Sequence, residues 1–142
     1  MGRLGCAGAV AAGLALAASM AVSGAGAAEA GLSDYQGAWL AQGPACADVF
    51  ATAGKGTTFR KPVDIFAPAF IIAGNRLRTP SASCRIKSLR PSGNHQVLAL
   101  DCATTISTAD VKVLVATLPD GTLRRYFNEQ DNVGTGYQKC SP

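Results

Sequence analysis

The sequence predicts a small all-β domain: an antiparallel up-and-down barrel or sandwich of about eight strands, with one short helix and two disulfides. Short extended runs recur at near-even spacing along the chain, and turn residues separate them. No long helical pattern is visible after residue 28, so the sequence offers no crossovers for a parallel sheet. Four cysteines follow that position, an even number that suits disulfides.

The N-terminal residues 1–28 have the pattern of a secretory signal peptide. Arg3 supplies a positive charge, residues 4–22 are apolar, and small residues follow them. We expect cleavage between Ala27 and Glu29, where small residues suit the peptidase. An uncleaved membrane anchor is the alternative, because about 20 apolar residues are long enough to span a bilayer.

The expected mature domain, residues 29–142, is periplasmic or secreted and has no stable membrane insertion after cleavage. It keeps 13 − 1 = 12 of the Lys and Arg residues against 9 Asp and Glu, because Arg3 leaves with the signal peptide. The formal charge is therefore 12 − 9 = +3. A chain of this length forms one domain, which excludes a multidomain enzyme, a coiled coil and a polytopic membrane protein.

The cysteine positions predict two disulfides. Cys6 leaves with the signal peptide, and an oxidising compartment then favours pairing of the other four. Those four are Cys46, Cys84, Cys102 and Cys140. They lack any C-x-x-C spacing, so a zinc site is not expected.

Hairpin geometry selects among the three possible connectivities. Residues 83–89 and 96–103 look extended, with turn residues around Gly93 between them. A hairpin centred on Gly93 places Cys84 opposite Cys102, at a separation that a disulfide accepts. This predicts Cys84–Cys102 and leaves the other two cysteines, Cys46 and Cys140, to join the ends of the domain.

The first elements of the domain are short. A strand is expected over residues 36–41, followed by the one helical candidate at residues 45–53, between Pro44 and Gly54. A second short strand is expected over residues 57–61.

Two further hairpins follow from turn chemistry. Gly74-Asn75 favours a two-residue turn that places Ile72 opposite Leu77. Pro119-Asp120-Gly121 is a turn between strands at residues 111–118 and 122–127. A last short strand is expected over residues 136–140.

The first expected strand carries a family resemblance. Gly37-Ala38-Trp39, followed by successive hairpins, resembles the G-x-W signature of lipocalin-like (calycin) barrels. The same stretch, with Cys46 shortly after it, is similar to the small periplasmic barrels that inhibit secreted proteases in bacteria. The resemblance implies that Trp39 closes one end of a barrel, with a small apolar ligand held beneath it. The alternative is that Trp39 is an ordinary core aromatic of a small β domain.

The search for catalytic and metal-binding residues gives little. The chain has one histidine, His95, which we expect to be a solvated turn residue. It has no cysteine or paired carboxylate at useful spacing, so a histidine-based nucleophile triad is excluded, and one histidine is too few for a multi-histidine metal site. Residues 128–132 gather oxygen-bearing side chains but lack EF-hand spacing, which favours a polar loop over a calcium site. We therefore expect no catalytic residue, no cofactor and no metal, and a protein that is not an enzyme.

Charge placement is the remaining feature. No acid lies between Asp64 and Asp101, whereas this interval holds five basic residues. The expected hairpins place most of these side chains on the outer face of the sheet. These form the arginine stripe: Arg76, Arg78, Arg85, Lys87 and Arg90. Arginines bind carboxylates and phosphates, so the stripe suits an anionic polysaccharide or a lipid headgroup. A solvated face is the alternative, and nucleic acid is not expected because the stripe lacks interleaved aromatics.

Adjacent arginines mark a second position of interest. In the strand that contains Arg124 and Arg125, one side chain should point outward and the other inward. An inward arginine needs a partner, and Asp110 or Glu129 is the expected one.

Two functional hypotheses follow. The first is a non-catalytic binding protein of the cell envelope, which either carries a small ligand or inhibits another envelope protein. The second is a structural or interaction module that docks an anionic envelope component through the arginine stripe.

Overall fold

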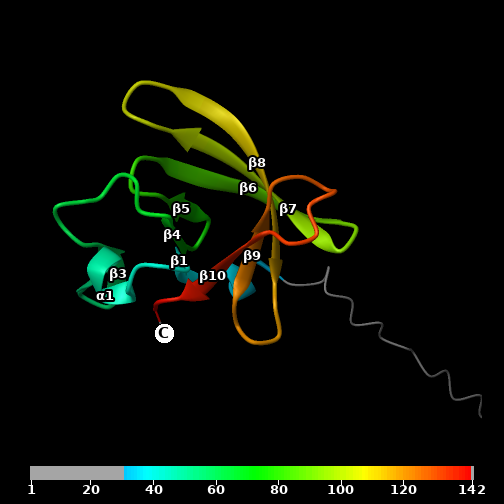
Figure 1. Ribbon diagram of the computed structural model, residues 1–142. Helices are drawn as coiled ribbons and strands as arrows, with labels where there is room; N and C mark the ends of the chain where they lie inside the picture. Colours follow the sequence, from blue (N-terminus) through cyan, green and yellow to red (C-terminus); the bar gives the residue numbers. More distant parts are fainter. Residues whose placement is uncertain (1–30, 142) are drawn as a thin grey trace, which may run out of the picture.

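The computed structural model describes residues 31–141. The expected signal peptide and Cys6 lie outside the described residues. The described chain forms a closed barrel of eight antiparallel strands in the order β1-β10-β9-β8-β7-β6-β5-β4 (Figure 1). The barrel strands are β1 (Gly37–Ala41), β4 (Ala69–Ala73), β5 (Arg76–Arg78), β6 (Ser83–Ser92), β7 (His95–Ala103), β8 (Thr108–Thr117), β9 (Leu123–Tyr126) and β10 (Thr135–Lys139).

The topology is up-and-down: β4 to β9 each pair with the next strand in sequence, and β1 closes the barrel by pairing with both β10 and β4. The predicted barrel is therefore confirmed, and the sandwich alternative is wrong. A 3-10 helix, η2 (Leu32–Tyr35), precedes β1. It packs buried Tyr35 into the barrel core.

The expected helix at residues 45–53 is wrong in its second half. Helix α1 covers only Cys46–Val49, and Phe50–Ala53 is strand β2, which pairs with β3 (Gly56–Phe59) outside the barrel. The cause is aromatic pairing across the hairpin, because Phe50 stacks on Phe59 with ring centroids 5.6 Å apart. These rings pack on outward side chains of β1 and β4, including Leu40 and Ile71.

Both predicted disulfides are confirmed. Cys46–Cys140 joins α1 to the end of β10, and Cys84–Cys102 crosses between β6 and β7. The second bridge depends on a β-bulge at Lys87, which shifts the register of the β6–β7 hairpin between Ile86 and Ser88.

Strand β8 is paired unevenly along its two edges. It pairs with β7 along almost its whole length, but β9 accompanies it only from Leu114 to Thr117. Residues 108–113 therefore extend past the point where β9 leaves (Figure 1). This part of β8 has no pairing with β9.

Candidate ligand cavity

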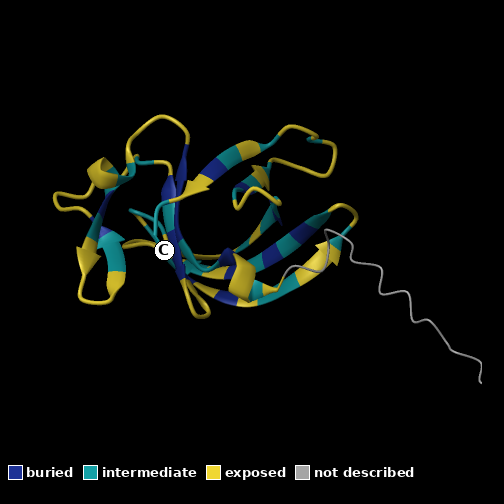
Figure 2. Ribbon diagram, turned by 90° about the horizontal axis from the view of Figure 1, so that it is seen from below, coloured by how far each residue is buried: buried dark blue, intermediate teal, exposed yellow. Residues whose placement is uncertain are grey.

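The barrel encloses an apolar cavity of about 320 Å³. Alternate residues of β7 and β8 point into it, because side chains of a strand alternate between its faces. Its lining is Tyr35, Phe70, Ile72, Leu77, Thr79, Ala82, Cys84, Leu98, Leu100, Cys102, Thr104, Ser107, Ala109, Val111, Val113, Val115, Leu123, Arg125 and Tyr137. The volume is at the lower end of the range of small-molecule sites. Figure 2 shows buried residues and more exposed residues following one another along the strands.

The floor of the cavity is built around Tyr35. Its hydroxyl donates a hydrogen bond to the side-chain oxygen of Gln96, which is itself only 3% exposed. Its backbone carbonyl accepts a hydrogen bond of 2.8 Å from Trp39 Nε1. Burial raises the pKa of Tyr35 to about 12, with a smaller contribution from the charge of Asp34. Tyr35 is therefore a neutral hydrogen-bond donor at physiological pH.

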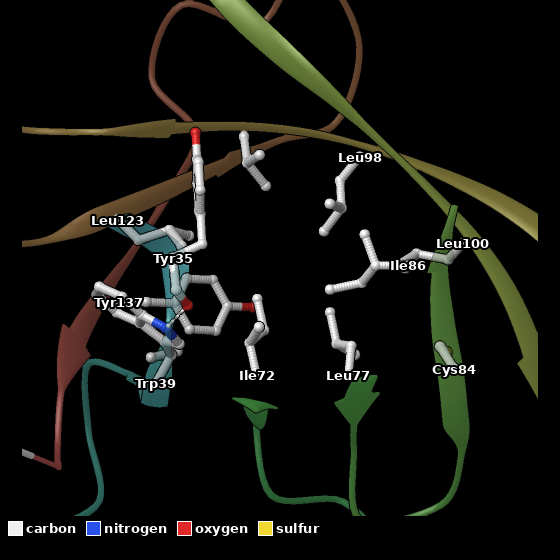
Figure 3. Close-up of a cluster of buried hydrophobic side chains, with 12 residues drawn as sticks. Tyr35, Trp39, Ile72, Leu77, Cys84, Ile86, Leu98, Leu100, Leu123 and Tyr137 are labelled. Atoms are coloured by element: carbon white, nitrogen blue, oxygen red, sulfur yellow. Dashed lines mark hydrogen bonds between the residues drawn. The ribbon is translucent and has the colours of Figure 1, made fainter. Parts of the chain in front are cut away.

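Trp39 lies in the core and does not line the cavity. Its side chain is 2% exposed and packs with Tyr35 and Tyr137 at one end of the cluster (Figure 3). Lys139 Nζ lies 5.7 Å from the centroid of its ring. Trp39 is thus a core aromatic that supports the floor, and any ligand contact at this end is made by the two tyrosines.

Two short turns form part of the rim. In the β5–β6 connection, Thr79 Oγ1 accepts hydrogen bonds from the amides of Ser81 and Ala82, at 3.3 and 3.0 Å. In the β7–β8 connection, Thr104 Oγ1 accepts one from the amide of Ser107, at 3.1 Å. These hydroxyls hold their own turns, so the rim presents few free polar groups.

Arg125 is the charged residue of the lining. It alternates with buried Leu123 along β9 and pairs with buried Val115, which places it on the inner face. Arg124 points outward, and its guanidinium donates to the carbonyl of Val133 at 2.7 Å. The prediction that one arginine faces inward is confirmed for Arg125.

The expected partner of Arg125 is wrong. Asp110 pairs instead with Lys87, whose ammonium lies 2.7 Å from its carboxylate and lowers the pKa of Asp110. Arg125 has no ion pair or side-chain hydrogen bond among residues 31–141. Its exposure at the edge of the barrel explains this, because the guanidinium reaches solvent while its stem borders the cavity.

The arginine stripe lies on the outside of β5 and β6. Arg76 stands directly opposite Arg85 in the register of these strands. Arg85 also lies 3.8 Å from Asp101 on β7. The stripe residues, Arg76, Arg78, Arg85, Lys87 and Arg90, are all exposed. Acids on β7 and β8 therefore neutralise part of the stripe, which the distribution of charge along the sequence did not indicate.

The polar loop between β9 and β10 is organised by its own side chains. Asp131 accepts hydrogen bonds from the amides of Phe127, Val133 and Gly134, at 2.9, 3.0 and 2.9 Å. These bonds lower the pKa of Asp131. Its oxygen atoms serve the loop backbone, and no group of three or more metal-ligating side chains is found among residues 31–141.

His95 differs from the sequence expectation. It begins β7 and is half-buried, with its ring stacked on Tyr126 at a centroid distance of 3.9 Å. The turn that was expected around it is shorter, because the β6 and β7 strands extend to Ser92 and His95.

Sequence reasoning missed most of the cavity residues. Gln96 was detectable in principle, since it shares the alternation of Leu98 and Leu100 and is therefore a polar residue at an inward position. Tyr35 had no such signal, because it lies in η2 before the first strand.

Comparison with protein-family models, with curated proteins and with solved structures found no match. Among residues 31–141, no helix has the length and apolar character needed to cross a membrane.

Proposed function

We propose that this chain is an exported, non-catalytic binding protein of the cell envelope that carries a small ligand in the barrel. The apolar cavity supports this proposal most directly. A well-packed domain leaves few voids larger than a water molecule, whereas this barrel leaves about 320 Å³. The G-x-W resemblance at Gly37-Ala38-Trp39 to lipocalin-like barrels supports the same reading.

Export is supported by two observations. The two disulfides of the domain are consistent with an extracellular or periplasmic location. Residues 1–28 have the composition of a cleaved signal peptide.

Direct binding tests the carrier function. Protein expressed from the full-length chain, with its disulfides formed, is titrated with the neutral amphiphile decan-1-ol by calorimetry. Ala109→Trp places a large ring at the rim of the cavity, and we expect it to weaken binding at least tenfold, an order-of-magnitude figure for blocking an apolar site. Ala109 is exposed, so the protein should still fold.

The matched control is Ala103→Trp. Ala103 is also exposed, but it lies at the end of β7 and does not line the cavity. Equal binding in both variants contradicts the carrier function, and so does failure of the parent protein to bind decan-1-ol, decanoate and decyl phosphate. Native mass spectrometry of protein from the envelope of its host then identifies any ligand or inhibited protein that is retained.

A second candidate function is docking of an anionic polysaccharide or lipid headgroup through the arginine stripe. The apposition of Arg76 and Arg85 favours it, because like charges directly opposite each other destabilise a sheet. Asp101 lies 3.8 Å from Arg85, but Arg76 has no ion pair among residues 31–141. Replacing Arg76, Arg78 and Arg85 together by glutamine should abolish salt-sensitive binding to an anionic polysaccharide and leave binding of decan-1-ol unchanged.

A further inference from the structure

The cavity borders a second hollow, which lies on the outside of the barrel. This side depression, of about 520 Å³, lies between β8 and the loop that follows β9. Val113 and Arg125 line both the cavity and the side depression. These two residues lie next to the point where the pairing of β8 and β9 ends, at Leu114 and Tyr126.

Arg125 is the one charged side chain on the lining of the cavity within the described chain. The rest of that lining is apolar apart from the rim hydroxyls, the floor tyrosines and the Cys84–Cys102 bridge. A guanidinium at such a boundary offers several N–H donors in a plane, which matches the oxygens of a carboxylate or phosphate. Because Arg125 takes part in neither ion pair of the described residues, these donors are available to a ligand.

The side depression adds a second cation. Lys112 lines it, on the outward face of β8. Two carboxylates also border it, but Asp131 is engaged by three backbone amides of its own loop. Glu129 is the remaining acid, and it has no ion pair among residues 31–141. The depression therefore holds two cations and two carboxylates, but the oxygens of Asp131 are already bound by its own loop, whereas Arg125 and Lys112 take part in neither ion pair of the described residues.

We infer that the ligand is a single-chain amphiphile with an anionic head group, its chain in the cavity and its head in the side depression against Arg125 and Lys112. The inference rests on the proposed carrier function. At about 30 Å³ for a group the size of a water molecule, 320 Å³ accommodates roughly ten such groups. This volume suits one chain of medium length and excludes the two long chains of a phospholipid.

The test compares ligands that share a chain and differ in the head group. Protein from the full-length chain is titrated at pH 7.5 and low salt with decanoate, decyl phosphate and decan-1-ol. We expect the better anion to bind about tenfold more tightly than the alcohol, as for a charge-assisted hydrogen bond. Preference for decanoate identifies a fatty acid, and preference for decyl phosphate identifies a phosphorylated chain.

Variants then assign the head group to its site. Arg125→Gln should weaken binding of the preferred anion about tenfold and leave decan-1-ol within about twofold. Glu129→Gln should strengthen anion binding about twofold to fivefold, because it removes a competing charge. Arg90→Gln is the matched control: it removes an exposed positive charge from the outer face of β6 and should leave all three ligands unaffected.

The possible failures are distinct. Equal affinity for decan-1-ol and for both anions, or equal weakening of all three ligands by Arg125→Gln, overturns the head-group assignment and leaves the carrier function in place. Failure of all three ligands to bind the parent protein overturns the carrier function, and the inference with it. A similar loss of anion binding in Arg90→Gln shows that net charge, and not the site at Arg125, determines the preference.

Discussion

The two disulfides should differ in their contribution to stability, because they close loops of very different length. Cys84–Cys102 spans 18 residues and Cys46–Cys140 spans 94. In the chain-entropy model, closing these loops reduces the entropy of the unfolded chain by amounts worth about 3.2 and about 4.7 kcal/mol at 25 °C. Replacing both cysteines of each bridge by alanine should therefore lower the free energy of unfolding more for the outer bridge, by about 1.5 kcal/mol.

Packing works against this difference. Cys84 is 3% exposed, whereas Cys46 and Cys140 are only half-buried. Truncation to alanine at the inner bridge consequently loses more buried side chain, at a cost on the order of 1 kcal/mol. The net difference between the two double variants should then fall between about 0.5 and 1.5 kcal/mol.

The measurement is urea unfolding of the parent and the two double variants, followed by circular dichroism, with near-ultraviolet spectra to show that each variant is folded. Equal slopes of unfolding free energy against urea concentration support a direct comparison. A larger loss in Cys84→Ala/Cys102→Ala than in Cys46→Ala/Cys140→Ala would show that packing around the inner bridge outweighs loop length. That result would refute the entropic reasoning.

Three further predictions concern single residues. Folding raises the pKa of Tyr35 from 10.0 to about 12, so its contribution to the free energy of unfolding is complete below pH 10 and is lost as the pH rises to 12. In urea unfolding across this range, the free energy of unfolding should decline less steeply with pH for Tyr35→Phe than for the parent protein. Gly37 has φ +120°, and an added Cβ would lie 2.8 Å from Lys139 Cε, so Gly37→Ala should lower the free energy of unfolding in urea by about 1–3 kcal/mol. Gly136→Ala, with open space around it, should leave that free energy unchanged. The pKa of Asp131 is lowered in the folded protein, so its stabilisation of the β9–β10 loop is present above the ordinary carboxylate range and is lost as the pH falls through the folded value. Asp131→Asn should accelerate amide hydrogen exchange of that loop at pH 7. Unchanged exchange would contradict the role assigned to the hydrogen bonds of Asp131.

The inner disulfide shows how far sequence reasoning reaches. A hairpin centred on Gly93 predicts the correct pairing of Cys84 with Cys102, but the structure reaches it by a different route. The strands continue to Ser92 and His95, and a strict register from that shorter turn would place Cys84 opposite Ala103. The bulge at Lys87 restores the disulfide register, and no rule of turn chemistry in the sequence indicates it.

Alternation along the strands predicts which side chains face inward, but it does not predict that the interior is hollow. The floor depends on Tyr35, which lies outside any strand. The position of Arg125 between the cavity and the side depression depends on where β9 leaves β8. Both are properties of the closed barrel, in which strand lengths and tilt decide how much space the inward side chains fill. The same limit applies to the arginine stripe, because its partial neutralisation comes from acids on neighbouring strands.

The cavity also accounts for the need for two bridges in so small a domain. An empty, sealed cavity costs about 24 cal/mol per Å³, so 320 Å³ corresponds to about 8 kcal/mol. Because exposed rim residues such as Ser107 and Ala109 line this cavity, it is not sealed, and that figure is an upper bound. The two disulfides together contribute about 8 kcal/mol in the chain-entropy model, which is of the same size. A barrel of this length can therefore keep an unfilled interior, whereas a domain of similar size without bridges would have to fill it with side chains. This retained space makes ligand binding the function to test first.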